Sequence, residues 1–270
     1  MVLIIKAELK KLMGDYKNYW FNYLFGNITL FILATGLFWT FAGQSQNHSG
    51  SMVVFLFGLF FWYFSGDALG MTSQMIFEEL MLGTFEQLLM TTSSIKKIIW
   101  SRLFVQFLLR TLFAAVFFTT LISVFDMWPS LGALGSKLLL LLTVFLIGVI
   151  GLYGMGFVVA GLALVFKQAG SIVGILSYFV LFFTGTVVEF ELLPAVIKPI
   201  AFLFPVTFAN KLMRELALPL GKVTFSGVLQ NKSFWLLIAN TLIWLFVGQL
   251  IFNKAMQLAK KKGNLGSYYF

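Results

Sequence analysis

The sequence of 270 residues is 60% hydrophobic and only 11% charged, with a net charge of +9. Soluble domains are about 45–50% apolar and about 25% charged, so this composition excludes a water-soluble fold and indicates an integral membrane protein. The chain has no cysteine, which excludes disulfides, thiolate metal sites and cysteine nucleophiles.

Few residues are suited to catalysis or to metal binding. The single histidine, His48, lies in the polar stretch GQSQNHSG and is interpreted as a solvated loop residue. We therefore expect neither a metal site nor a catalytic site in this chain. No stretch fits the glycine-rich phosphate-binding loop, so we expect the chain itself to bind no ATP and no other cofactor.

The first 18 residues predict an amphipathic helix that lies in the plane of the lipid headgroups. Its basic residues are Lys6, Lys10, Lys11 and Lys17, and its apolar face consists of Val2, Ile5, Leu9, Leu12, Met13 and Tyr16. Basic residues elsewhere also lie at the ends of apolar runs. This pattern favours anionic lipid over nucleic acid as the partner of the positive charge.

Long apolar runs occupy most of the remaining sequence. A helix needs about 20 apolar residues to cross a hydrocarbon core about 30 Å thick. The runs do not alternate as the strands of a membrane barrel do, so we predict helices. The whole chain, 1–270, is predicted to be one all-α transmembrane domain with six spans: Tyr19–Phe41, Met52–Ser73, Ile98–Phe125, Lys137–Phe166, Ala169–Val188 and Phe234–Phe252.

The distribution of basic residues predicts the orientation, because basic residues favour the cytoplasmic side. If both termini are inside, the inner segments hold twelve basic residues and the outer segments hold six. We therefore predict a multi-pass protein of the plasma membrane with both termini in the cytoplasm.

Residues 75–92, between the second and third spans, form a charged patch in this apolar chain. We predict one short amphipathic helix here, which ends at the stretch TTSS (91–94), a helix stop and N-cap signal. At 100° per residue its apolar ridge is Phe77, Met81, Phe85 and Leu88, with Glu79 and Glu86 opposite and Glu78 beside them. Gly83 is expected to allow close approach of another backbone. The ridge either docks into a groove of a partner or rests on lipid and on the protein's own helices.

Residues 189–215, between the fifth and sixth spans, are apolar but interrupted by three prolines, Pro194, Pro199 and Pro205. Proline breaks helices, so this segment is too interrupted to span the membrane. We predict two short re-entrant helices that dip into the outer leaflet, followed by a surface helix and loop.

Four charged residues mark a possible pathway or gate. Asp67 in the second span and Arg110 in the third are costly at depth; a structural ion pair or separate snorkelling is favoured, and substrate contact is the alternative. Glu189 and Glu191 follow the fifth span. They are either a solvated helix end or a charged gate at the outer mouth.

Glycines are frequent in the fourth and fifth predicted spans. Gly148 and Gly151 lie in the fourth span, and Gly170 and Gly174 open the fifth at small-xxx-small spacing. Small residues let helices approach closely in lipid. We expect these positions to serve packing within the chain, with a dimer seam or a hinge as the alternative.

With these segments placed, the chain resembles the permease subunit of type-2 ABC transporters. The resemblance rests on the stretch GTFEQLLMTTSSIKKIIWSRL after the second span, preceded by an acidic pair, and on the stretch LPAVIKPIAFLFPVTFANKLMREL between the fifth and sixth. The amphipathic lead and the six spans match as well, so the resemblance covers nearly the whole chain. This family often has a proline soon after the part of the first stretch that reads GTFEQLL, where this chain has MTTSS.

The resemblance implies a half-transporter. Two such permeases, identical or different, pair with two separate ATPase subunits, which bind ATP and Mg²⁺. Residues 75–92 are then the coupling helix, seated in a groove of the ATPase, and residues 189–215 are the re-entrant helices that narrow the exit. The implied function is ATP-driven export, and the near absence of buried charge favours an amphiphilic drug, peptide or lipid-like substrate.

Three other functions stay open from the residues alone. A secondary transporter driven by an ion gradient needs inverted repeats and several intramembrane acids, whereas Asp67 is the one deep acid and no repeat is visible. A non-transporting sensor or scaffold needs no substrate pathway. An intramembrane enzyme is poorer still, because no catalytic constellation is present.

Overall fold

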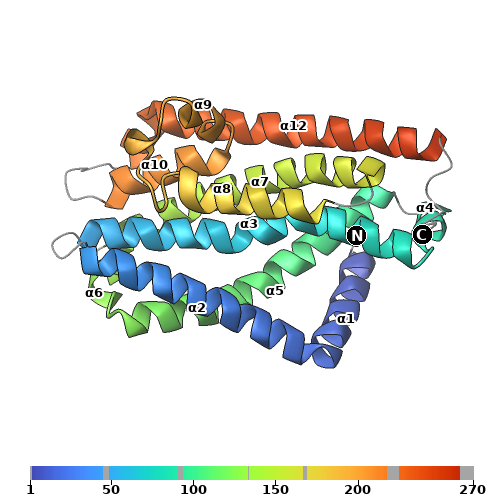
Figure 1. The fold of residues 1–270 in the computed structure, drawn as a ribbon, viewed down its shortest axis with the longest axis horizontal. Coiled ribbons are helices and arrows are strands. Elements are labelled where there is room, and N and C mark those ends of the chain that lie inside the picture. Colours follow the sequence, from blue (N-terminus) through green and yellow to red (C-terminus); the bar gives the residue numbers. More distant parts are fainter. Residues whose placement is uncertain are drawn as a thin grey trace.

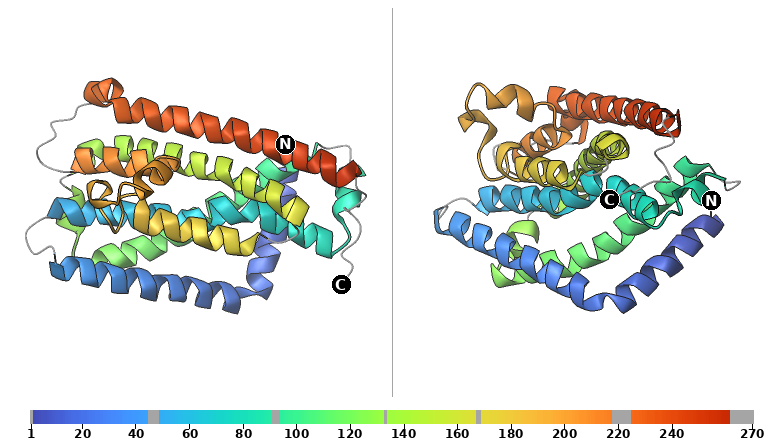
Figure 2. Two further views of the ribbon diagram at one scale, coloured as in Figure 1. Left: turned by 45° about the horizontal axis from the view of Figure 1, so that its top comes forward. Right: turned by 45° about the vertical axis from the view of Figure 1, so that its right-hand side comes forward.

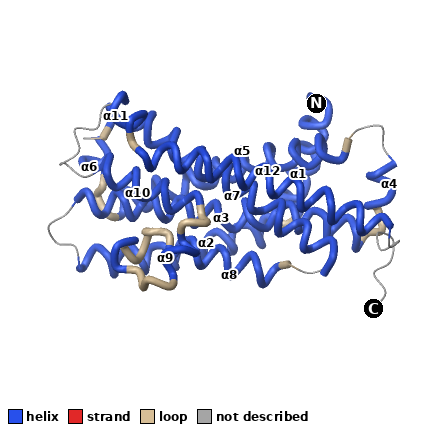
Figure 3. Tube along the Cα trace, turned by 90° about the horizontal axis from the view of Figure 1, so that it is seen from above, coloured by secondary structure: helices blue, strands red, loops and turns tan. Residues whose placement is uncertain are grey.

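Helices make up nearly all of the chain (Figure 1), as the composition predicts. The computed structural model describes residues 2–44, 49–90, 94–132, 134–166, 169–217 and 225–261. Figure 3 shows that the part of the chain that the structure describes consists mostly of helix and contains no strand. The polar stretch around His48 lies outside the described residues.

The chain follows an up-and-down path with short helices at both ends of the bundle. In order, the helices are α1 (Val2–Asn18), α2 (Trp20–Gln44), α3 (Ser49–Met81), α4 (Phe85–Met90), α5 (Ile95–Val124), α6 (Trp128–Gly132), η1 (Gly135–Lys137), α7 (Leu138–Phe166), α8 (Gly170–Phe183), η2 (Phe190–Leu192), α9 (Ile197–Ala201), α10 (Pro205–Ala217), α11 (Phe225–Gln230) and α12 (Lys232–Lys261).

Five of the described helices are long and apolar enough to cross a membrane: α2, α3, α5, α7 and α12. Within its most apolar stretch α3 is 78% buried, whereas α2 is only 11% buried. The helix α3 therefore lies at the centre of the core, packed against α7 and α8, while α2 lies at the edge. Exposed apolar side chains on the outer helices, such as Trp39, Val116 and Phe246, suit contact with lipid.

Close helix contacts at the centre depend on the glycines of α7. A Cβ atom on Gly148 would lie 2.7 Å from the ring of Phe61, and one on Gly151 would lie 2.6 Å from Pro205. A Cβ on Gly154 would lie 2.7 Å from backbone atoms of α12. Small residues therefore let α7 pack against α3, α10 and α12, as predicted for Gly148 and Gly151.

The fifth predicted span is wrong in length. The sequence predicts a span over Ala169–Val188, but α8 ends at Phe183 and has 14 residues. At about 1.5 Å per residue it is about 21 Å long, shorter than the hydrocarbon core. Gly170 and Gly174 on this helix have no atom within 4 Å of the position of an added Cβ. The prediction that these two glycines pack within the chain is therefore also wrong.

Polar side chains hold the chain where α8 ends. Gly185 has a φ of +93°, a conformation that favours glycine, and lies between Thr184 and Thr186. The buried amide nitrogen of Asn210, on α10, donates to the Thr184 carbonyl at 3.0 Å and to the Thr186 hydroxyl at 3.1 Å. The unwound turn after α8 is therefore attached to α10.

The proline-interrupted segment 189–215 forms short helices, as predicted, and none of them is of spanning length. Pro205 begins α10, a position that suits proline because the first turn lacks a hydrogen-bonding partner for its N–H groups. The helix α10 is not the predicted surface helix, because Val206, Leu212 and Met213 are buried and it packs against α7, α12 and α3.

The helix α1 leaves the bundle at an angle to α2, so that the two form a bent arm beside α3 and α5 (Figure 2). Of the predicted apolar face, Leu12 is buried and Tyr16 is half-buried against the other helices. Leu9 and Met13 are exposed, as apolar side chains that face lipid would be, and the placement of this helix in the headgroup plane stays a prediction. The inward face also contains Glu8, which is 9% exposed.

Candidate functional site

The helix α3 ends in a glycine cap. Its last turn is closed by hydrogen bonds from the Gly83 N–H to the Leu80 carbonyl at 3.2 Å and from the Thr84 N–H to the Glu79 carbonyl at 3.0 Å. This pair of bonds is the Schellman motif, which needs a left-handed residue, and Gly83 has a φ of +67°. A new helix, α4, begins at Phe85. The prediction of one continuous helix over 75–92 is therefore wrong, and residues 91–92 lie outside the described part.

The cap rearranges the predicted apolar ridge. Phe85 is 1% exposed and belongs to the core, so it is not available to a partner. Phe77 and Leu88 are intermediate in exposure, and Met81 is 48% exposed. An added Cβ on Gly83 would meet nothing within 4 Å among the residues that the structure describes, so none of their backbone approaches it closely.

We call residues 78–90 the α3–α4 corner. Its exposed apolar side chains are Met81, Leu82 at 73% exposed and Met90 at 86% exposed, and its exposed acids are Glu78 and Glu86. The beginning of α1 and the end of α12 lie at the same end of the bundle as this corner (Figure 1). The corner thus presents apolar and acidic side chains together at one end of the molecule.

A buried ion-pair cluster fixes this corner to two other helices. The Arg102 guanidinium, on α5, donates from Nε to Oε1 of Glu8 and from Nη1 to Oε1 of Glu79, each at 2.8 Å. The Thr84 hydroxyl donates to the other oxygen of Glu79 at 2.6 Å. The charged side chains of Glu8, Glu79 and Arg102 are only 11–13% exposed. We call Glu8, Glu79, Thr84 and Arg102 the Arg102 cluster.

The Arg102 cluster corrects one prediction and was missed by the sequence reasoning. Glu79, predicted on the face opposite the apolar ridge and open to pairing with a basic residue or to solvent, is buried and paired with Arg102 of this chain. Glu8 could have been found, because it shares a helical face with Leu12, four residues later, and is therefore an acid on an apolar face. Arg102 gave no such signal, since it lies near the basic start of a span, where a positive charge is ordinary. Ser94 occupies the N-cap of α5 but makes no side-chain capping bond.

The deep residues Asp67 and Arg110 form an ion pair, one of the two arrangements that the sequence left open. Arg110 donates from Nη2 to Oδ1 of Asp67 at 3.0 Å and from Nε to the other carboxylate oxygen. The guanidinium also lies 5.0 Å from the ring centre of Tyr63, whose hydroxyl donates to Asn27 at 3.0 Å. The two charges neutralise each other inside the helix bundle, which lowers the cost of placing them there.

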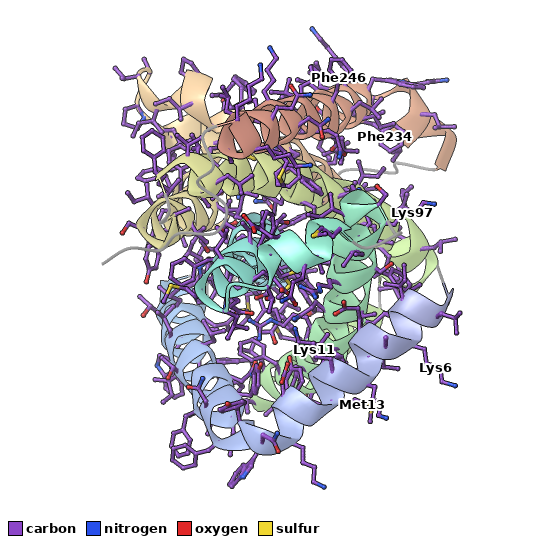
Figure 4. All side chains as sticks on the ribbon, turned by 90° about the vertical axis from the view of Figure 1, so that its right-hand side faces the viewer. Lys6, Lys11, Met13, Lys97, Phe234 and Phe246 are labelled. Atoms are coloured by element: carbon purple, nitrogen blue, oxygen red, sulfur yellow. The ribbon has the colours of Figure 1, made fainter. Side chains whose placement is uncertain are left out.

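A cavity of about 850 Å³ extends between α1, α2, α3 and α5. The Asp67–Arg110 pair lies at one end of it, and Arg102 lines the end near the α3–α4 corner. Figure 4 looks at this end of the bundle. The side chains of Lys6 and Met13 point away from the other helices, and Lys11 lies on the side of α1 that faces them. The cavity therefore connects the two buried ion pairs.

The residues predicted as an outer gate lie at the other end of the bundle. Glu189 forms an ion pair with Arg214 of α10. Lys198 donates to the backbone carbonyl of Glu191 at 2.9 Å, and the Glu191 side chain is exposed. Pro194 is exposed as well. The gate residues are thus close to one another but are not gathered into one site with Asp67 and Arg110.

Apolar helices of spanning length, exposed apolar faces and buried ion pairs define an α-helical, multi-pass membrane protein. The family model described as ABC-2 type transporter matches residues 1–218, and the chain belongs to that family. It is accordingly a transmembrane permease subunit, a kind of subunit that in general works as a dimer with an ATPase. No curated protein matches the chain. The matched residues include the α3–α4 corner, the Arg102 cluster and the cavity.

Proposed function

We propose that this chain is the permease half of an ATP-driven exporter in the plasma membrane, with both termini in the cytoplasm. A second permease, identical or different, completes the pathway. Separate ATPase subunits bind ATP and Mg²⁺ and dock at the α3–α4 corner. The twofold excess of basic residues in the inner segments supports this orientation.

The observation that carries the proposal is the combination of an exposed corner with a buried anchor. Leu82 and Met90 are exposed enough to enter a groove, and burial of a leucine or methionine side chain contributes about 1.5–3 kcal/mol. Glu86 offers a carboxylate to basic residues of the groove. Behind the corner, the Arg102 cluster connects the end of α3 to α1 and α5. A force applied to the corner therefore moves three helices together.

The substrate pathway is placed between two permeases, along the exposed side of α8. Ile175 and Tyr178 on this helix are 69% and 56% exposed, and Gly170 and Gly174 leave open space beside it. The pathway opens past residues 189–215, whose short helices narrow the exit. Apolar exposed helix faces support an amphiphilic drug, peptide or lipid-like cargo rather than a sugar.

Disruption of the exposed corner tests the docking. The double variant Leu82→Ser/Met90→Ser removes apolar contact worth about 3 kcal/mol or more, which is about a hundredfold in affinity for the ATPase. Co-expression with a candidate ABC ATPase subunit, followed by affinity purification and measurement of ATP turnover, reports the loss. Phe85 is unsuitable for this test because its substitution opens a hole in the core.

A matched control shows whether a loss of ATPase binding is specific to the α3–α4 corner or follows from the replacement of any exposed leucine. Leu139 is 78% exposed at the start of α7, at the opposite end of the bundle, so Leu139→Ser should leave ATPase binding unchanged. Equal recovery of the ATPase with the double variant and with the wild type would show that the corner is not the docking site.

The ion pair at Asp67 argues against transport driven by an ion gradient. Such a transporter needs a carboxylate that exchanges protons or ions at depth. Asp67 is already neutralised by Arg110 within the described residues. Transport that persists in vesicles without the ATPase would favour this alternative.

A further inference from the structure

The cavity between α1, α2, α3 and α5 is long, partly open and lined by tyrosines; we call it the tyrosine cavity. Its lining on α3 runs from Asp67 to Met81, which at about 1.5 Å per residue is about 21 Å. Its volume of about 850 Å³ lies within the range of about 300–1,000 Å³ that is usual for small-molecule sites. The cavity is therefore large enough for an amphiphilic molecule.

Most charged side chains around the tyrosine cavity have a partner of opposite charge, and two carboxylates do not. Asp67 pairs with Arg110 at the deep end. At the end near the α3–α4 corner, Glu8 and Glu79 face two cations, Arg102 and Lys11, since Arg102 bonds both acids and Lys11 interacts electrostatically with Glu79.

The two remaining carboxylates, Asp15 and Glu78, have no ion-pair partner among the described residues. Glu78 accepts one hydrogen bond, from the Gln74 amide at 3.0 Å. Both acids lie within electrostatic range of the Tyr23 hydroxyl, so they act on the same part of the cavity. Although the chain is basic overall, this cavity carries an uncompensated negative charge.

Aromatic rings lie beside these two carboxylates. Tyr16 stacks on Tyr23 with ring centroids 4.0 Å apart and on Phe113 with ring centroids 5.3 Å apart, so both of its faces are covered. Tyr19 lines the same cavity, and Tyr23 has its other face turned away from Tyr16. Burial raises the pKa of Tyr16 to about 12, so its hydroxyl is neutral at physiological pH. The faces of tyrosine rings attract cations, and their bodies offer apolar contact. Carboxylates next to aromatic faces are the surroundings that an organic cation prefers.

We propose that the tyrosine cavity binds an organic cation with an apolar body, which reaches it from the cytoplasmic side. Asp15 and Glu78 supply the countercharge, and Tyr19 and the face of Tyr23 that is not covered by Tyr16 contact the body of the ligand. The identification of this cation as cargo rests on the proposed function, whereas its binding does not. A divalent metal ion is a poorer occupant, because the described residues contain no group of three or more acids or histidines that could surround it.

Two probes of the same shape and opposite charge test the proposal. The full-length chain, in nanodiscs of phosphatidylcholine and without an ATPase, is dialysed against tetraphenylphosphonium or tetraphenylborate, with empty nanodiscs as the background. We expect saturable binding of the phosphonium cation only. Asp15→Asn and Glu78→Gln should each weaken that binding about fivefold, and the double variant about 25-fold.

Two further variants keep the test decisive. Asp126 is an exposed carboxylate after α5, outside the cavity, so Asp126→Asn should bind the cation as the wild type does. Glu78→Lys should shift the preference toward tetraphenylborate. Equal binding of both probes by the wild type, or unchanged cation binding by the Asp15→Asn/Glu78→Gln variant, would overturn the inference.

The outcomes also distinguish this inference from the proposed function. Cation binding by a chain that recruits no ATPase would leave the site standing and refute the exporter. Recruitment of an ATPase by a chain that does not bind the cation would do the opposite. In a complete complex, ATP turnover stimulated by tetraphenylphosphonium and lost in the double variant identifies the bound cation as cargo.

Discussion

Removal of the Arg102 guanidinium should destabilise the protein strongly. In Arg102→Met the carboxylates of Glu8 and Glu79 stay behind, with side chains that are 11% exposed and no cation between them. Loss of one partner from a buried ion pair costs about 3–5 kcal/mol. Because the cluster keeps slight exposure, we expect the lower figure, about 3 kcal/mol, which is about 6–12 °C in Tm at about 2–4 °C per kcal/mol.

Thermal unfolding in detergent, followed by the fluorescence of the seven tryptophans, measures this loss. The triple variant Arg102→Met/Glu8→Gln/Glu79→Gln carries no unpaired charge and should recover most of the stability. Arg102→Lys should be intermediate, because an ammonium does not match the fork that reaches both carboxylates. An Arg102→Met protein that unfolds with the wild type, or a triple variant no more stable than the single one, would refute the reasoning.

Three further predictions concern the backbone and the deep ion pair, each measured by the same unfolding assay. Gly154→Ala places a methyl group 2.7 Å from backbone atoms of α12 and should cost about 1–3 kcal/mol, whereas Gly66→Ala, with nothing within 4 Å, should be neutral or slightly stabilising. Gly83→Ala forces a side chain into the left-handed conformation and should cost about 1–2 kcal/mol, and Gly83→Asn should cost less; equal Tm values for the two variants would contradict the capping role. Asp67→Asn leaves Arg110 without its countercharge and should lower Tm, and Asp67→Asn/Arg110→Gln should be more stable than Asp67→Asn alone.

The positions of the long helices followed from the sequence, because apolar runs of sufficient length have one stable form in lipid. Their ends did not follow in the same way. The helix α3 continues to Met81, eight residues beyond the predicted end of its span at Ser73. Apolarity reports where a helix is in lipid, whereas a cap such as Gly83 decides where it stops.

The end of α8 could not be read from hydropathy. Thr184, Gly185 and Thr186 are only weakly polar, so hydropathy does not interrupt the apolar run before Val188. The chain unwinds there because Asn210, on another helix, supplies hydrogen bonds to Thr184 and Thr186. A partner 24–26 residues away leaves no mark on local periodicity.

The sequence predicted which segment forms the candidate site, but not which of its side chains are exposed. A helical wheel assumes an unbroken helix, so it placed Phe85 on the outer ridge and Glu79 opposite it. The cap at Gly83 turns Phe85 into the core, and Arg102 draws Glu79 inward. For Asp67 and Arg110, the cost of an isolated charge at depth left two solutions open, an ion pair or separate snorkelling, and the structure has the ion pair.

The separation of Glu8 and Arg102 along the chain bears on biogenesis. The two residues are 94 positions apart, and translation adds about 5–20 residues per second. Glu8 is therefore synthesised about 5–20 seconds before Arg102, its cation. Until then its carboxylate is hydrated at the membrane surface. A nascent chain interrupted before the third long helix lacks Arg102, so it cannot lock the amino-terminal helix in place.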